Sequence, residues 1–152
     1  MNFQESDFIS IDDFSLIWRW TQESHKVLPK TVLNSIKPLS LSLSSKLYSI
    51  GLNNYSKLEE SSPSVFEASY KNQKSVRETL VSLTKNEIEE IYIVWDNETA
   101  VITTWKSFVN YWDDFCYPSS DDVFVFPSSN SWILAYRHFE QFEFLNLSSG
   151  AN

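Results

Sequence analysis

The sequence predicts an α+β fold in which N-terminal helices precede a β-hairpin, an amphipathic helix and a β-meander. Two observations support this prediction. Apolar residues recur at helical spacing in much of residues 1–90, whereas β-branched and aromatic runs bounded by turn residues dominate residues 91–147. Since the strands follow one another through short turns, we expect an antiparallel sheet of about five strands packed on helices. The 152 residues are long enough to bury one core as a single domain, residues 1–152.

Four helices are predicted in the first half. The first has a cap at Asp12 or Asp13. The second has Pro29 at its first position and stops at Pro38, and the third starts at Ser40 and stops at Gly51. The fourth begins at the sequence SVRE, residues 75–78, which matches a capping box. Residues 53–74 are rich in Ser, Asn and Lys and include Pro63, so we expect a long, mobile loop there.

Five strands are predicted in the second half. The runs IYIVW (91–95) and AVITTW (100–105) are joined by the turn sequence DNET and should form a hairpin. Three further runs are separated by short turns and should form a meander: 123–127, 131–139 and 141–147. These five strands make up the predicted sheet.

An amphipathic helix is predicted between the hairpin and the meander, over residues 105–115. Thr104 precedes it as a cap, and its apolar residues fall at i, i+3, i+4, i+7 and i+10: Trp105, Phe108, Val109, Trp112 and Phe115. This spacing leaves four polar residues on the expected outer face: Lys106, Asn110, Asp113 and Asp114. Pro118 cannot continue the helix, so the stretch FCYPSSDDV, residues 115–123, is read locally as a helix stop before the next strand.

The net charge of −8 lies entirely in the second half. Residues 1–76 hold eight Lys/Arg and eight Asp/Glu, whereas residues 77–152 hold four and twelve. A field of this sign repels nucleic acid and anionic membranes and attracts a basic partner, although acidity also serves solubility alone. The N-terminus lacks a basic start and an apolar signal core, and no apolar run reaches about 18 residues. We therefore expect a cytoplasmic protein.

Patterns for catalysis, cofactors and metals are missing from the sequence. With two glycines, no glycine-rich phosphate loop can be formed. Cys116 is the only cysteine and lies at a predicted helix C-terminus, where the helix dipole disfavours a thiolate. The chain has two histidines, His25 and His138, and the adjacent Asp121 and Asp122 would point apart in an extended segment. We expect a binding protein without cofactor or metal, with a small carboxylate-dependent hydrolase as the alternative.

An acidic contact surface is predicted around the stretch 113–122. Tyr117 lies among four aspartates there, which combines an aromatic anchor with negative charge. The predicted contact residues are Asp113, Asp114, Tyr117, Asp121 and Asp122, with Glu89, Glu90 and Glu98 as further members. The same residues also fit a solvated loop with no further role.

The stretch 91–144 resembles the immunity proteins of bacterial contact-dependent inhibition and other polymorphic toxin systems. The resemblance lies in a small, acidic, glycine-poor and Trp-rich chain, above all in TTWKSFVNYWDDFCYPSSDDV followed by SWILAYRHFEQFEF. It implies a non-enzymatic inhibitor that binds a cognate toxin domain, often a basic nuclease, and blocks it with carboxylates that mimic phosphate. A structural or regulatory cytoplasmic protein is a further alternative.

Overall fold

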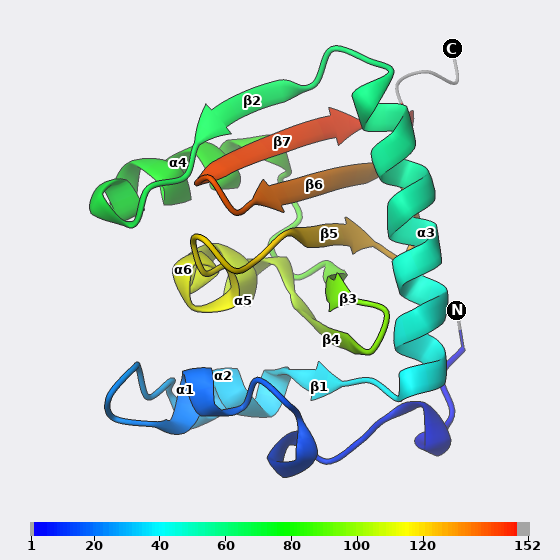
Figure 1. Ribbon diagram of the computed structural model, residues 1–152, viewed down its shortest axis with the longest axis vertical. Helices are drawn as coiled ribbons and strands as arrows, with labels where there is room; N and C mark the ends of the chain where they lie inside the picture. The colour runs from blue at the N-terminus through cyan, green and yellow to red at the C-terminus, as the bar shows by residue number, and fades with distance from the viewer. Residues whose placement is uncertain (1, 149–152) are drawn as a thin grey trace.

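The computed structural model describes residues 2–148, which form one antiparallel sheet with helices packed on it (Figure 1). The sheet has seven strands in the order β1-β4-β3-β5-β6-β7-β2. The α+β class is confirmed, and the sheet has two strands more than the five predicted. Each of the additional strands, β1 and β2, comes from the first half of the chain and lies at one edge of the sheet.

The elements follow one another along the chain as short helices, a long helix, and then strands separated by helices. The helices are α1 (Trp18–Thr21), α2 (Lys30–Ser35), α3 (Leu41–Glu59), α4 (Gln73–Leu83), α5 (Trp105–Asn110) and α6 (Trp112–Phe115), with 3₁₀ turns η1 (Glu5–Asp7), η2 (Ile11–Asp13) and η3 (Tyr70–Asn72). The strands are β1 (Lys37–Pro38), β2 (Ser64–Glu67), β3 (Glu90–Asp96), β4 (Thr99–Thr104), β5 (Val123–Pro127), β6 (Trp132–Arg137) and β7 (Gln141–Asn146). None of the helices within residues 2–148 is long and apolar enough to cross a membrane.

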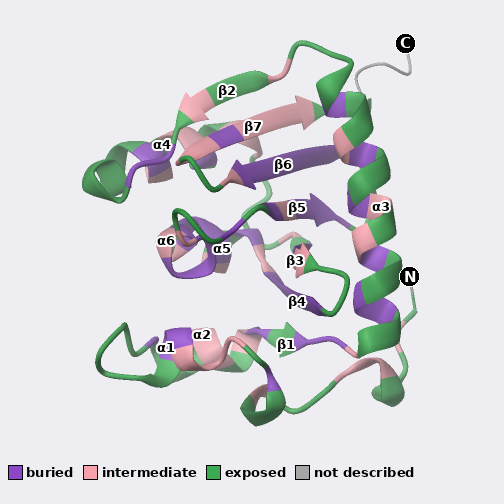
Figure 2. Ribbon diagram, viewed as in Figure 1, coloured by how far each residue is buried: buried purple, intermediate pink, exposed green. Residues whose placement is uncertain are grey.

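Both faces of the sheet are covered by apolar packing. Successive side chains of a strand point to opposite faces, so Ile91 and Ile93 of β3 join one buried cluster while Tyr92 and Val94 join another. The first cluster contains buried apolar residues of α4, α5 and α6, and the second contains residues of α3. The central strands are consequently buried almost throughout, as Figure 2 shows.

Helix α3 begins where the sequence predicts but does not end at Gly51. The Ser40 hydroxyl accepts a hydrogen bond from the Leu43 N–H at 3.3 Å, which is the expected cap. The helix continues to Glu59, and Gly51 lies against β5: a Cβ at this position would be 2.6 Å from Phe124 Cδ2. Gly51 therefore permits close packing of α3 on the sheet, and its interpretation as a helix stop was wrong.

Residues 53–74 are not a long loop. The end of α3, the strand β2 and the turn η3 occupy most of them, and β2 pairs antiparallel with β7, from Ser64 opposite Phe144 to Glu67 opposite Gln141. The next helix, α4, starts at Gln73, two residues before the expected capping box at 75–78. The missed strand, β2, is an edge strand whose hydrogen-bonding partner lies about 80 residues further along the chain.

The short N-terminal helices differ in their details from the prediction. The first α-helix, α1, starts at Trp18, and its N-cap residue, Ile17, makes no side-chain capping bond, so neither Asp12 nor Asp13 caps it. These two aspartates lie in the separate turn η2, where the Ser10 hydroxyl accepts from the Asp12 N–H at 3.3 Å. Pro29 lies one residue before α2 instead of at its first position, and Pro38 belongs to β1.

The amphipathic stretch 105–115 is confirmed in its buried face and its cap. Thr104 Oγ1 accepts a hydrogen bond from the Ser107 N–H at 3.2 Å, and all five predicted apolar residues are buried. The helix is interrupted at Tyr111, whose backbone (φ −129°, ψ 29°) is not helical, so that α5 and α6 are separate. This interruption changes which side chains face outward.

Candidate partner-binding surface

Asp121 belongs to a buried ion pair and not to the protein surface. Its two carboxylate oxygens accept hydrogen bonds from the Arg19 guanidinium at 2.6 and 3.0 Å, and one of them also accepts from the Tyr117 N–H at 2.9 Å. Asp121 is 7% exposed and Arg19 is 5% exposed. The guanidinium also lies over the Tyr117 ring, 4.0 Å from its centroid. The pair therefore fastens α1 to the loop before β5, and the predicted contact role of Asp121 needs correction.

Asp114 is also buried, with 6% of its surface exposed, although the sequence predicts it on the outer face of the helix. Its carboxylate lies 3.2 Å from Lys26 Nζ, and its backbone carbonyl accepts from the Trp20 indole N–H at 3.1 Å. The break at Tyr111 begins a new helix, α6, in which Asp114 faces the N-terminal segment. The backbone carbonyl of Asp114 thus provides a second contact between α6 and this segment.

Stability at neutral pH is expected to rise when Asp114 is replaced by asparagine. Burial, with a smaller contribution from the neighbouring Asp113 and an opposing one from Lys26, raises the pKa of the Asp114 carboxyl in the folded protein. The folded state therefore binds the proton of this carboxyl more tightly than the unfolded state does. As pH rises from the unfolded pKa through the folded pKa, the free energy of unfolding falls.

Urea unfolding at several pH values tests this prediction. We expect Asp114→Asn to be more stable than the wild type at pH 7, with the gain disappearing below about pH 4. Asp13→Asn is the control, because Asp13 is exposed and is not among the groups that shift the pKa of Asp114. If the gain in stability of Asp114→Asn does not change with pH, the ionised Asp114 carboxyl is not the cause of the gain.

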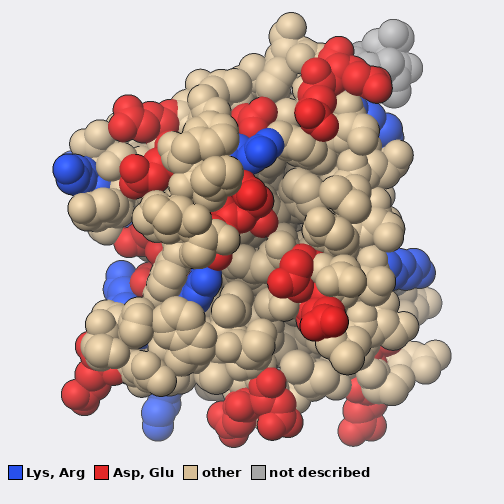
Figure 3. All heavy atoms as spheres, in the orientation of Figure 1, with Lys and Arg blue, Asp and Glu red and all other residues tan. Residues whose placement is uncertain are grey.

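The remaining predicted contact residues do not form one surface. Asp122 is exposed, and its carboxylate accepts from Arg137 Nε at 3.3 Å and from the His138 N–H at 3.0 Å. Glu98 lies in the turn of the β3–β4 hairpin, whereas Glu89 and Glu90 lie at its other end. Figure 3 accordingly shows Asp and Glu in several separate groups on the face in view, with Lys and Arg between them.

Two neighbouring hollows lie at the end of the sheet opposite α3, where β2 ends beside the β6–β7 turn (Figure 1). Glu140 lines both of them. The first, of about 300 Å³, is also lined by Tyr70, Trp112, Asp113, Tyr117 and Tyr136; the second, of about 350 Å³, by Val65, Glu67 and Phe139. Asp113 and Tyr117 are thus the two predicted contact residues that lie together here.

Glu140 is held between the hollows by the backbone. It has a left-handed conformation (φ 62°), and its N–H donates to the Arg137 carbonyl at 2.9 Å to close the β6–β7 turn. Its own carbonyl accepts from the Ala68 N–H at 2.8 Å, which ties the turn to the segment after β2. Two segments about 70 residues apart in sequence therefore form one surface.

The surface around the hollows combines exposed aromatic rings with unpaired negative charge. Tyr70 and Phe139 are 55% and 56% exposed. Glu67, Asp113 and Glu140 form no ion pair with any residue of the described range 2–148. We call these five residues, together with Tyr117, the acidic–aromatic surface.

Neutral polar groups line the first hollow beneath these carboxylates. Burial is the largest cause that raises the pKa of the Cys116 thiol and of the Tyr117 and Tyr136 hydroxyls, so all three are protonated at neutral pH. The indole N–H of Trp112 is buried and has no hydrogen-bond partner within residues 2–148. Between residues 2 and 148, no three His, Cys, Asp or Glu side chains gather in a way that could hold a metal ion.

The sequence prediction missed Glu67, Tyr70, Phe139 and Glu140. The first two lie in the segment expected to be a loop. Phe139 was expected as the last residue of the strand 131–139 and Glu140 as the residue before the next strand, whereas both lie in the β6–β7 turn. The run SVFE, residues 64–67, does contain two residues that favour strands, and this was the available signal. Its pairing with β7 could not be read from the local sequence.

Comparison of the chain with models of known protein families found no match, and neither did comparisons with curated proteins and with solved structures.

Proposed function

We propose that this chain is a non-enzymatic cytoplasmic binding protein of the bacterial immunity class, and that it neutralises a basic toxin domain through the acidic–aromatic surface. One observation carries the proposal: three carboxylates without a basic partner surround two adjoining hollows that are bordered by exposed aromatic rings. The net charge of −8 acts in the same direction, since it attracts a basic protein over a distance.

Each component of the surface has a physical role in this proposal. Tyr70 and Phe139 are large rings with few rotatable bonds, of the kind that supply much of the binding energy in protein interfaces. Glu67, Asp113 and Glu140 attract Lys or Arg side chains of the partner, which raises the association rate and selects the orientation of the complex. Since these carboxylates have no cation of their own, a bound partner displaces no internal ion pair.

Charge reversal at the centre of the surface tests the proposal. A toxin domain encoded beside the gene for this chain is the first candidate partner. We expect Asp113→Lys combined with Glu140→Lys to abolish protection of cells that express this toxin and to weaken binding, measured by calorimetry, by about tenfold to a hundredfold.

Glu59→Lys combined with Glu60→Lys is the matched control. It produces the same change in net charge at exposed residues near the end of α3, outside both hollows. The control variant should protect and bind as the wild type does. Equal protection by the two double variants would refute the location of the surface, and failure of the wild-type chain to bind or protect would refute the function.

A further inference from the structure

A third hollow lies between α4 and the start of α5, away from the acidic–aromatic surface, and it differs in character. It has a volume of about 330 Å³, and Trp105, Val109 and Val81 provide its apolar lining. Val81 is 57% exposed although it is part of this lining. Ile88, which follows the lining residue Glu87 in sequence, is 78% exposed. Val81 therefore offers exposed apolar surface to another molecule at the edge of the hollow.

The border of this hollow is basic in a part of the chain that is otherwise acidic. Of the four Lys/Arg in residues 77–152, Lys85 and Lys106 line it, and Arg77 donates a hydrogen bond to the backbone carbonyl of Asn110, another lining residue. Lys85 and Lys106 form no ion pair within residues 2–148. One carboxylate, Glu87, is among the lining residues.

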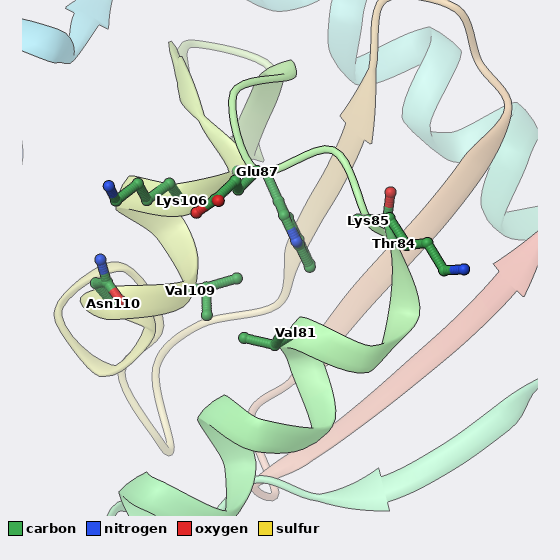
Figure 4. A pocket seen from close by; sticks show the side chains of 8 residues that line it. Val81, Thr84, Lys85, Glu87, Lys106, Val109 and Asn110 are labelled. Carbon is green, nitrogen blue, oxygen red and sulfur yellow. The ribbon is translucent and has the colours of Figure 1, made fainter.

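The directions of the side chains indicate what size of ligand fits. Figure 4 shows Val81 and Val109 pointing toward the middle of the hollow, with Lys106 and Asn110 on one side and Thr84 and Lys85 on the other. The two ammonium groups point outward at opposite sides. A ligand small enough to fill only the hollow would reach neither of them, whereas a peptide segment that crosses it would approach both.

We propose that this hollow binds an acidic amphipathic segment of a partner protein, with one or two aliphatic side chains inserted over Trp105, Val81 and Val109 and with Asp or Glu beside Lys85 and Lys106. The apolar insertion supplies the affinity, and the two lysines select negative charge on both sides of it. An amphipathic helix, with anchors at i and i+4, presents side chains in this way. This surface is distinct from the proposed toxin-binding surface, and its ligand has the opposite charge.

A peptide titration followed by ¹⁵N NMR tests the proposal on the full chain. The probe is a synthetic peptide with two leucines spaced i, i+4 among glutamates. We expect saturable shifts at the amides of Val81, Lys85, Lys106 and Val109. We expect Lys85→Glu combined with Lys106→Glu to weaken binding by about tenfold. The control, Lys46→Glu with Lys57→Glu, changes two exposed lysines of α3 and should bind as the wild type does.

Three results would overturn the proposal: no saturable shifts at these amides, equal binding by both double variants, or equal binding of a peptide in which glutamine replaces glutamate. If octanoate produces the same shifts more strongly than the peptide, the proposal is also overturned, and the hollow is a pocket for small ligands. The charge reversal of Lys85 and Lys106 should leave the binding of a basic toxin unchanged. A negative result in the peptide titration therefore does not bear on the proposed toxin-binding function.

Discussion

Replacing Asp121 with asparagine is expected to lower the free energy of unfolding by about 3–5 kcal/mol. The substitution removes the negative partner of Arg19 and leaves a buried guanidinium without a counter-charge. Only 6% of the Arg19 side chain is exposed to solvent, and its Nε atom already lacks a hydrogen-bond partner within residues 2–148. Chemical unfolding followed by tryptophan fluorescence measures the loss.

Asp122→Asn is the matched control, because it makes the same substitution at the next residue. Asp122 is 54% exposed in its side chain and its ion pair with Arg137 is accessible to water, so the expected loss is about 0–1 kcal/mol. Similar losses for the two variants would contradict the burial of the Arg19–Asp121 pair.

A double variant measures the interaction energy between Arg19 and Asp121. Arg19→Met combined with Asp121→Asn removes both charges, so no unpaired charge is left in the interior. We expect it to be more stable than Asp121→Asn alone, with a coupling energy of up to about 3 kcal/mol in the double-mutant cycle. Additive losses would mean that the two side chains act independently.

Replacing Phe108 with alanine is expected to cost about 3–5 kcal/mol of stability. Phe108 is fully buried, and its ring packs against Trp105, Phe115 and Phe142 with centroid separations of 5.7, 5.8 and 6.4 Å. Truncation removes the ring contacts of Phe108 with α6 and with β7, and leaves a cavity among large rings that cannot collapse into it.

Asn110→Ala is the control for this prediction. Asn110 is exposed at the end of the same helix, and its backbone carbonyl, which accepts from Arg77, is retained in the variant. The expected change is within about 0.5 kcal/mol. A loss of less than about 1.5 kcal/mol for Phe108→Ala would contradict a central position for α5 in the core.

The acidic–aromatic surface shows why sequence reasoning found only part of the site. Asp113 and Tyr117 were predicted because charge and an aromatic residue occur close together in the stretch 113–122. The same stretch also supplied Asp114 and Asp121, which are buried against Lys26 and Arg19 from the first 30 residues. An aspartate in an exposed loop and an aspartate in a buried ion pair look alike in a sequence, because the difference lies in a partner that is 102 residues away in the case of Asp121.

The sequence by itself determined the α+β class, the β3–β4 hairpin, the meander, the Thr104 and Ser40 caps and the buried face of 105–115. These features depend on side-chain periodicity and on hydrogen bonds between residues a few positions apart. Only the tertiary structure decided the edge strands β1 and β2, the packing role of Gly51 and the contacts of Asp114 and Asp121. Each of these depends on a partner far away along the chain, and such a pairing leaves no periodic signal in the local sequence.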